Sequence, residues 1–497
     1  MSLIPLNIPP GVYRNGTDLE QAGRWRDVNL VRWRDGSLRP VGGWETRKAS
    51  AFNSAARGMH QWVDNGGDYH IAAGTYNKLY DINPTTNAVI DITPVGLTAG
   101  EVDADENIGY GGSTYGTGLY GVTRPSSGIV DTLAATWSLD NWGEYLVACS
   151  DADGKLYEWQ LDRATPTAAA AISGAPTGCL GLIVTDERFL FALGAGNNPR
   201  KIQWCDREDN TTWTDAANNE AGDFELNTTG QIMQAVQLRG RVLIVTNTDA
   251  HAAFYQGPPY VYGFEKLGSA CGASSRHAVV SIGEGAFWFG KKGFFAFNGS
   301  SVEEVKCDVA DYVFADLNTI QISKVYGVHN SQFGEIWWFY PSSSSTENDR
   351  YVVFNYREGY WNFGAVERVS GFDRGILNTP VWADASGNIY NHELVGYSYG
   401  GDLPHAETGP VSLGSGERIM KVNKLIPDEE TQGEVQVSFK TRFHPNDTER
   451  TYGPYTSANP TSVRFSGRQA RMRIEAVDAS DWRAGIMRIE ARPGGKR

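Results

Sequence analysis

One short pattern recurs along the chain and constrains its fold more than any other feature. An apolar, β-rich run is followed in most cases by a polar turn and a second aromatic strand. The starts of successive runs are separated by 76, 44, 53, 44, 49 and 46 residues. Apart from the first, these intervals fit the roughly 40–50 residues of a four-stranded propeller blade. The pattern predicts an all-β protein with a β-propeller of six or seven blades over residues 49–400. The runs are YHIAAG from Tyr69, YLVACS from Tyr145, FLFALG from Phe189, VLIVTN from Val242, AFWFGK from Ala286, EIWWFY from Glu335 and VWADAS from Val381.

Two segments that resemble each other, DADGKLYEW at 151–159 and DASGNIYNH at 384–392, are predicted to be hairpin turns within this pattern. Asp and Gly provide the backbone conformations of a tight turn, and the strand that follows places Leu156 and Trp159 in the blade. A calcium loop needs more oxygen ligands and a distal Glu, which are missing. A sialidase-type Asp box is also ruled out, because Ala152 occupies the Asp position.

The first interval is about 30 residues too long, which predicts an insertion on one blade near residues 94–128. It contains GYGGSTYGTGLYG, with Tyr110, Tyr115 and Tyr120 spaced among glycines. Such a segment suits an extended loop that lays aromatic faces on another surface. A subunit contact or a channel-lining loop is one interpretation, and a solvent-exposed flexible loop is the other.

Residues 1–48 are rich in Trp, Arg, Pro and Gly, and we predict an extended arm rather than a separate domain. Trp and Arg are enriched at binding hot spots, so the arm is expected to dock on a neighbouring subunit. The alternative is that it closes its own propeller ring. Nearby acidic residues argue against nucleic-acid binding. We expect removal of residues 1–45 to leave a folded β protein that assembles poorly. The candidate interface residues are Arg24, Trp25, Arg26, Arg32, Trp33, Arg34 and Trp44.

Residues 401–497 change to strict alternation of apolar and polar residues, which predicts a small antiparallel β-sandwich. Arg471, Arg473 and Arg488 fall on the polar face of these strands. They are interpreted either as solvated arginines or as part of an interface built from Arg–carboxylate pairs.

Composition narrows the functional classes. The net charge is −14, with totals of 44 Lys/Arg and 58 Asp/Glu. Subtracting the two ends leaves 21 Lys/Arg and 40 Asp/Glu in residues 49–400. An acidic centre disfavours a grip on nucleic acid, although DNA could pass it without sticking. No signal peptide or apolar run long enough to span a membrane is present, and the five scattered cysteines are expected to be buried, reduced thiols.

No catalytic or metal-binding motif is found. The sequence lacks HExxH and GxSxG, and its eight histidines show no metal-ligand spacing. GAFWFGKK at 285–292 matches part of a phosphate loop, but its interior reads as a strand and Lys292 replaces the Ser or Thr. We predict a protein that is not an enzyme and binds no cofactor or metal. A glycosidase carboxylate pair is left open, because its two members can be far apart in sequence.

The segments GRWRDVNLVRWRDGSLRPVGGW, GYGGSTYGTGLYG and the chain end, including VRFSGRQARMRIE and GIMRIEARPGGKR, resemble tail proteins of tailed bacteriophages. The likeness is strongest to the propeller-bearing nozzle or tail-tube proteins of short-tailed phages. It implies a structural virion protein, assembled in the host cytoplasm and located in the virion tail. It further implies a ring of copies, commonly six, below the portal and adaptor, that conducts DNA during ejection.

Two other functions remain open from the sequence. A tail-tip or side adhesin could bind host-surface glycan through the propeller, since propellers also present ligand pockets. A carbohydrate-cleaving propeller is the third class. In the ring interpretation, the partners are other copies of the chain, the portal or adaptor and other tail components. DNA would pass without specific binding, and no membrane insertion is expected.

Overall fold

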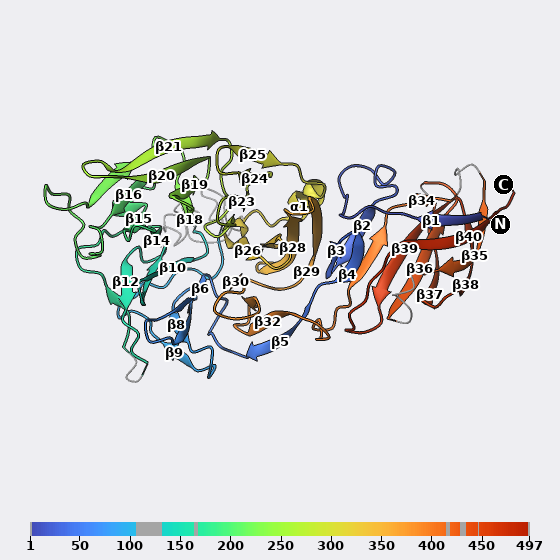
Figure 1. Cartoon of the computed structure of the whole chain (residues 1–497), viewed down its shortest axis with the longest axis horizontal. Helices are drawn as coiled ribbons and strands as arrows, with labels where there is room; N and C mark the ends of the chain where they lie inside the picture. Colours follow the sequence, from blue (N-terminus) through green and yellow to red (C-terminus); the bar gives the residue numbers. More distant parts are fainter. Residues whose placement is uncertain are drawn as a thin grey trace, which may run out of the picture.

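The computed structural model describes residues 2–105, 132–163, 167–413, 418–427, 434–445 and 447–495. The molecule is elongated, with a β-propeller at one end and a β-sandwich at the other (Figure 1). Both chain termini lie at the sandwich end. Among the described residues, no helix is long and apolar enough to cross a membrane.

Within the described ranges the propeller has seven antiparallel sheets of four strands each. Six of them are continuous in sequence, and the seventh takes one strand from the N-terminal region. The first four blades are β6 (Met59–Val63), β7 (Tyr69–Gly74), β8 (Leu79–Ile82), β9 (Val89–Asp91); β10 (Trp137–Trp142), β11 (Tyr145–Ser150), β12 (Leu156–Trp159), β13 (Ala170–Ala171); β14 (Gly181–Val184), β15 (Leu190–Leu193), β16 (Lys201–Trp204), β17 (Gly222–Glu225); and β18 (Ile232–Leu238), β19 (Arg241–Thr246), β20 (Asp249–Gly257), β21 (Val261–Ser269). The last three are β22 (Val279–Ser281), β23 (Ala286–Phe289), β24 (Phe294–Phe297), β25 (Val302–Val305); β26 (Tyr326–Asn330), β27 (Glu335–Pro341), β28 (Asn348–Asn355), β29 (Tyr360–Ala365); and β30 (Ser370–Phe372), β31 (Val381–Ala383), β32 (Ile389–Leu394), β5 (Gly43–Lys48).

The prediction of a β-propeller is confirmed, and the structure has seven blades rather than six. Each of the seven apolar runs found in the sequence forms the second strand of one blade, from β7 to β31. These strands are apolar throughout because both of their faces are covered by neighbouring blades. DADGKLYEW forms the predicted hairpin between β11 and β12, where Leu156 and Trp159 are buried and Gly154 has a φ of 68°.

The innermost strands of successive blades pack side by side in a closed ring, in which β30 of the last blade also contacts β6 of the first. Adjacent inner strands are also connected by hydrogen bonds from a side chain of one strand to the backbone of the next. The amide of Gln234 accepts from the N–H of Val279 at 2.9 Å and donates to its carbonyl at 3.0 Å. These two residues are 45 positions apart, which is about one blade length, so the hydrogen bonds connect the inner strands of two adjacent blades.

The sandwich consists of two antiparallel sheets, each of which contains a strand from the N-terminal region. Sheet 1 has the order β1-β40-β35-β38, and sheet 2 has the order β2-β33-β39-β36-β37 with β34 paired to β39. The strands of sheet 1 are β1 (Ser2–Leu6), β40 (Met487–Pro493), β35 (Met420–Ile426) and β38 (Thr461–Gly467). Those of sheet 2 are β2 (Trp25–Asn29), β33 (His405–Thr408), β39 (Gln469–Ala476), β36 (Val435–Arg442), β37 (Arg450–Thr456) and β34 (Val411–Ser412).

The structure corrects the expectation that residues 1–48 form an extended arm. β1 and β2 pair with the sandwich strands β40 and β33, and β5 pairs with β32 to complete the seventh blade. Between them, β3 (Val31–Arg34) and β4 (Ser37–Pro40) form a hairpin at the junction of the two domains. The segment therefore belongs to both domains, and it does close its own propeller ring. Each of these three strands pairs with a strand of its own chain, so the segment does not extend from the body as a free arm.

A single hydrophobic core runs from the sandwich through the N-terminal segment into the propeller. It joins Trp25 and Trp33 to sandwich residues such as Ile474 and to propeller residues such as Trp338 and Trp361. The only α-helix of the described residues, α1 (Ala310–Asp316), packs on this core through Val313. Because the interface is apolar and continuous, the two domains are held as one body.

Candidate functional site: the domain junction and the axial cavity

Arg32, predicted to dock on another subunit, is instead buried between two propeller blades of its own chain. Its guanidinium donates to the Glu335 carboxylate at 3.0 and 2.9 Å and to Glu393 at 2.8 Å. It also lies 3.7 Å from the centre of the Phe333 ring. Burial opposes the positive charge, but the two carboxylates outweigh it and raise the pKa of Arg32. Arg32 thus fixes the hairpin β3–β4 to blades six and seven.

Trp25 and Trp33 are buried as well, and their rings pack together with centroids 6.0 Å apart. Trp33 also makes an edge-to-face contact with Tyr360 of β29. Trp44 lies on the closing strand β5, with the Arg368 guanidinium 4.9 Å from its ring. These three tryptophans therefore stabilise the chain's own fold.

Asp18 collects three arginines at the junction. Its carboxylate lies 2.7 Å from Arg26, 2.7 Å from Arg442 and 2.6 Å from Arg471. Partial burial works against the carboxylate, but the three guanidinium groups lower the pKa of Asp18. Arg–carboxylate pairs were one of the two interpretations of Arg471, and the structure places them within one chain.

The remaining predicted residues differ in their surroundings. Arg24 lies 3.5 Å from Asp308 of the propeller, and Arg473 pairs with Glu475 at 2.9 Å. Arg34 is exposed at the hairpin tip, and Arg488 is exposed on the outer face of sheet 1. Tyr110, Tyr115 and Tyr120 lie outside the described residues.

The root of the predicted insertion is held by residues that sequence reasoning missed. The amide of Gln321 accepts from the N–H of Ala104 at 2.9 Å and donates to its carbonyl at 2.7 Å. The buried Lys324 ammonium pairs with Asp103 and with Glu347. None of these side chains belongs to a motif, so only their proximity in space reveals the role.

The propeller axis holds a cavity of about 440 Å³, bordered by the inner strands β6, β10, β14 and β18. His60 and Asp140 face it, with the His60 Nε2 4.0 Å from the Asp140 carboxylate. Burial raises the pKa of Asp140. At one end the rings of His277 and Tyr326 stack 4.8 Å apart. Both rings border the cavity.

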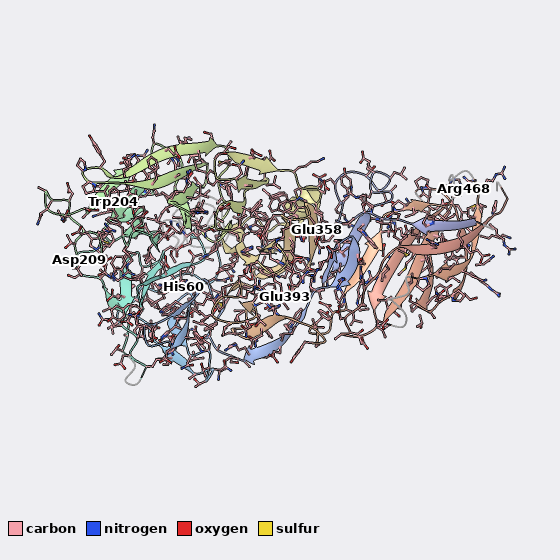
Figure 2. All side chains as sticks on the ribbon, viewed as in Figure 1. His60, Trp204, Asp209, Glu358, Glu393 and Arg468 are labelled. Carbon is pink, nitrogen blue, oxygen red and sulfur yellow. The ribbon has the colours of Figure 1, made fainter. Side chains whose placement is uncertain are left out.

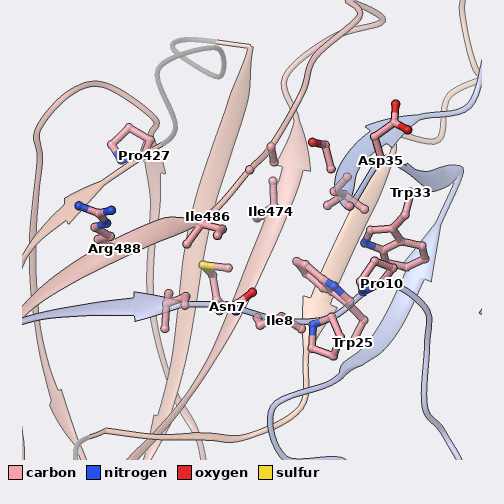
Figure 3. Close-up of a pocket in the computed structure, with 18 of the residues that line it drawn as sticks. Asn7, Ile8, Pro10, Trp25, Trp33, Asp35, Pro427, Ile474, Ile486 and Arg488 are labelled. Carbon is pink, nitrogen blue, oxygen red and sulfur yellow. The ribbon is translucent and has the colours of Figure 1, made fainter.

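A second hollow, of about 740 Å³, lies between the hairpin and the open end of the sandwich (Figure 3). Trp25 and Trp33 lie toward one end of it and Arg488 toward the other. Ile474 and the exposed Ile486 contribute apolar surface. Neither hollow brings together three or more His, Cys, Asp or Glu side chains suited to a metal, and no other part of the described chain does so.

The fold and these sites define a seven-bladed β-propeller that is joined rigidly to a β-sandwich. No protein-family model matches the chain, and no curated protein matches it. The solved structures similar to it include BamB from Moraxella catarrhalis, with 10% identity, a TM-score of 0.38, and coverage of 79% of this chain and 99% of that one. The N-terminal domain of Nup159 has 8% identity, a TM-score of 0.39, and coverage of 71% and 96%.

Proposed function

We propose that this chain is a structural component of a phage tail that assembles with copies of itself into a ring, with six copies favoured. In this proposal the ring lies below the portal and adaptor in the virion tail and conducts DNA during ejection. The likeness of both chain ends to nozzle proteins supports this assignment. The protein would act as a building block rather than as a catalyst.

The observation that carries the proposal is the rigid connection of the two domains. Residues 1–48 are shared between propeller and sandwich, and one core crosses the junction. A subunit that must bear load in a ring benefits from such a body, because a flexible junction would let neighbouring contacts shift.

The path of DNA in this proposal runs through the hole of the ring and not through any single propeller. The cavity among the inner strands of the propeller is only about 440 Å³, and the stacked rings of His277 and Tyr326 border it. An acidic wall around a wider bore would repel the phosphates and keep the polymer sliding.

Imaging of the purified full-length chain tests the proposal. We expect closed rings with a central hole in negative-stain micrographs and a matching mass by light scattering. A chain that stays monomeric at every concentration tested, or that assembles only when bound to an unrelated scaffold, would contradict it.

A glycan-binding adhesin is the second candidate, and the axial cavity is the observation that favours it. His60, Ser138, Asp140 and Gln237 border this cavity and offer both donors and acceptors to a hydroxylated ligand. A glycan-array signal that is lost in Asp140→Asn would support the adhesin. Binding that is unchanged in this variant, or absent from the array, would count against a site in the cavity.

A further inference from the structure

The outer face of sheet 1 is strongly basic in a chain that is acidic overall. Alternation along β40, β35 and β38 turns their apolar residues inward and their charged residues outward. The outward residues, here called the basic face, are Lys421, Lys424, Arg464, Arg488 and Arg492, with Glu490 as the one acid among them.

Two of these arginines have no carboxylate partner within the part of the chain that the structure describes. Lys424 lies 3.7 Å from Glu490, but Arg464 and Arg488 form no ion pair with any described residue. Sheet 2 provides the contrast, because Arg471 and Arg473 on its polar face are paired with carboxylates of the same chain. The same residue type thus serves an internal junction on one sheet and remains available on the other.

The complementary surface is at the opposite end of the molecule. Residues 206–220 of blade three, here called the acidic loop, contain five Asp or Glu residues and a single Arg. Within the described chain none of these five carboxylates is ion-paired to Lys or Arg. Those that form hydrogen bonds accept from backbone N–H groups or hydroxyls; Asp209, for example, accepts from the Thr211 hydroxyl at 2.6 Å. Figure 2 places Asp209 at the propeller end of the molecule, and Figure 1 places the strands of the basic face, β35, β38 and β40, at the sandwich end.

We propose that the basic face of one copy docks on the acidic loop of a second copy. Two different surfaces, one on each domain, make a heterologous contact, and such contacts close into rings when the rotation between copies permits it. Opposite charge steers the approach and fixes the orientation, since like poles repel. The inference rests on the proposed ring and identifies the surfaces that would form it.

A charge exchange between the two surfaces tests this docking. In the full-length chain, Arg464→Glu with Arg488→Glu gives an acidic face, and Glu208→Lys with Asp215→Lys gives a basic loop. All four side chains are exposed, so folding is expected to be preserved, which circular dichroism and the melting temperature check. Each double variant alone is expected to weaken self-association at least about tenfold, because like charges then meet at the contact.

Mixing the two double variants is expected to restore assembly, with the two kinds of copy alternating in native mass spectra. Lys291→Glu with Lys292→Glu is the matched control for the Arg464/Arg488 variant: it makes the same net charge change on exposed propeller residues and is expected to leave assembly unchanged. Higher salt is expected to weaken the unmodified assembly, since exposed charges are screened.

The outcomes separate the docking surfaces from the ring itself. If the unmodified chain forms rings and both double variants form them equally well, the docking surfaces are overturned while the ring stands. If the unmodified chain never assembles, the proposed ring itself is contradicted, and the docking surfaces with it. A duplex oligonucleotide is the remaining probe: binding to it that is lost in the Arg464/Arg488 variant, with assembly intact, would show a nucleic-acid surface and overturn docking.

Discussion

The hydroxyl of Tyr360 brackets the backbone of Trp33: it donates to the Trp33 carbonyl at 2.7 Å and accepts from the Trp33 N–H at 3.1 Å. The two residues are 327 positions apart and both are buried. One propeller side chain therefore satisfies both polar backbone groups of a hairpin residue that lies between the domains. This relationship explains why the N-terminal hairpin is held in one register.

Tyr360→Phe removes both hydrogen bonds and leaves a buried N–H and C=O without this partner. We expect the free energy of unfolding to fall by about 1–3 kcal/mol, which is the cost of leaving buried polar groups unsatisfied. Urea denaturation measures it. Tyr397→Phe, at a side chain that is 44% exposed, is the control and should change stability by less than about 0.5 kcal/mol. Equal effects of both variants would refute the role assigned to Tyr360.

Arg32→Met leaves Glu335 and Glu393 without the cation that they share. Removing one side of a buried ion pair costs about 3–5 kcal/mol, so we expect a large loss of stability or a poorly soluble product. Arg34→Met is the control on the same strand. Its side chain is 59% exposed and 3.9 Å from Asp35, so the expected change is within about 0.5 kcal/mol. A tolerant Arg32 position in thermal unfolding would contradict the structure.

Removal of residues 1–45 deletes β1 to β4 and the start of β5. From sequence alone, the expected product was a folded β protein with weak assembly. The structure changes that expectation: blade seven loses the first half of its outer strand, both sandwich sheets lose an edge strand, and the shared core is opened. We expect loss of near-ultraviolet circular dichroism and of cooperative unfolding.

A shorter deletion provides the comparison. Removing residues 1–6 takes away β1 alone, so the propeller closure and the hairpin are retained. This form should remain cooperative with a lower melting temperature. If the longer deletion melts like the intact chain, residues 1–45 are dispensable and the interpretation of this segment as part of both domains is incorrect.

His277 predicts a specific dependence on pH. Burial lowers its pKa to about 4, against about 6.5 for an unperturbed histidine. Between these values the unfolded chain binds the proton more strongly, so stability is full above about pH 6.5 and falls as the pH approaches 4. The shift is worth up to about 3 kcal/mol. His277→Gln should flatten this part of the stability profile measured by denaturant titration. An unchanged profile would show that protonation of His277 does not cause the loss of stability.

The five cysteines are buried and form no disulfides, and the sequence predicted that they would be buried. Burial raises the pKa of Cys271 to about 11 and that of Cys179 to about 12, which keeps both as unreactive thiols. We expect no thiol reaction with Ellman's reagent in the native protein and five reactive groups in guanidinium chloride. Fast labelling of the native form would show that the cysteine environments are more open than described.

Local sequence patterns identified the propeller because six of its seven blades are built from four strands that are consecutive in the sequence. The second strand of every blade is buried on both faces, so it reads as an apolar run, and the turn to the third strand follows within a few residues. DADGKLYEW was assigned correctly for this reason, since its hairpin needs no distant partner.

The sequence by itself determined which residues form blades and alternating sandwich strands, because side-chain periodicity reflects burial at each position. Only the tertiary structure decided what residues 1–48 bind. Ser2 pairs with Ala491 between two antiparallel strands, and Arg32 forms an ion pair with Glu335, more than three hundred residues away in the sequence. A stretch rich in Trp and Arg has the same composition whether its partner is internal or external, so the identity of that partner is set by the folded arrangement and not by any local pattern.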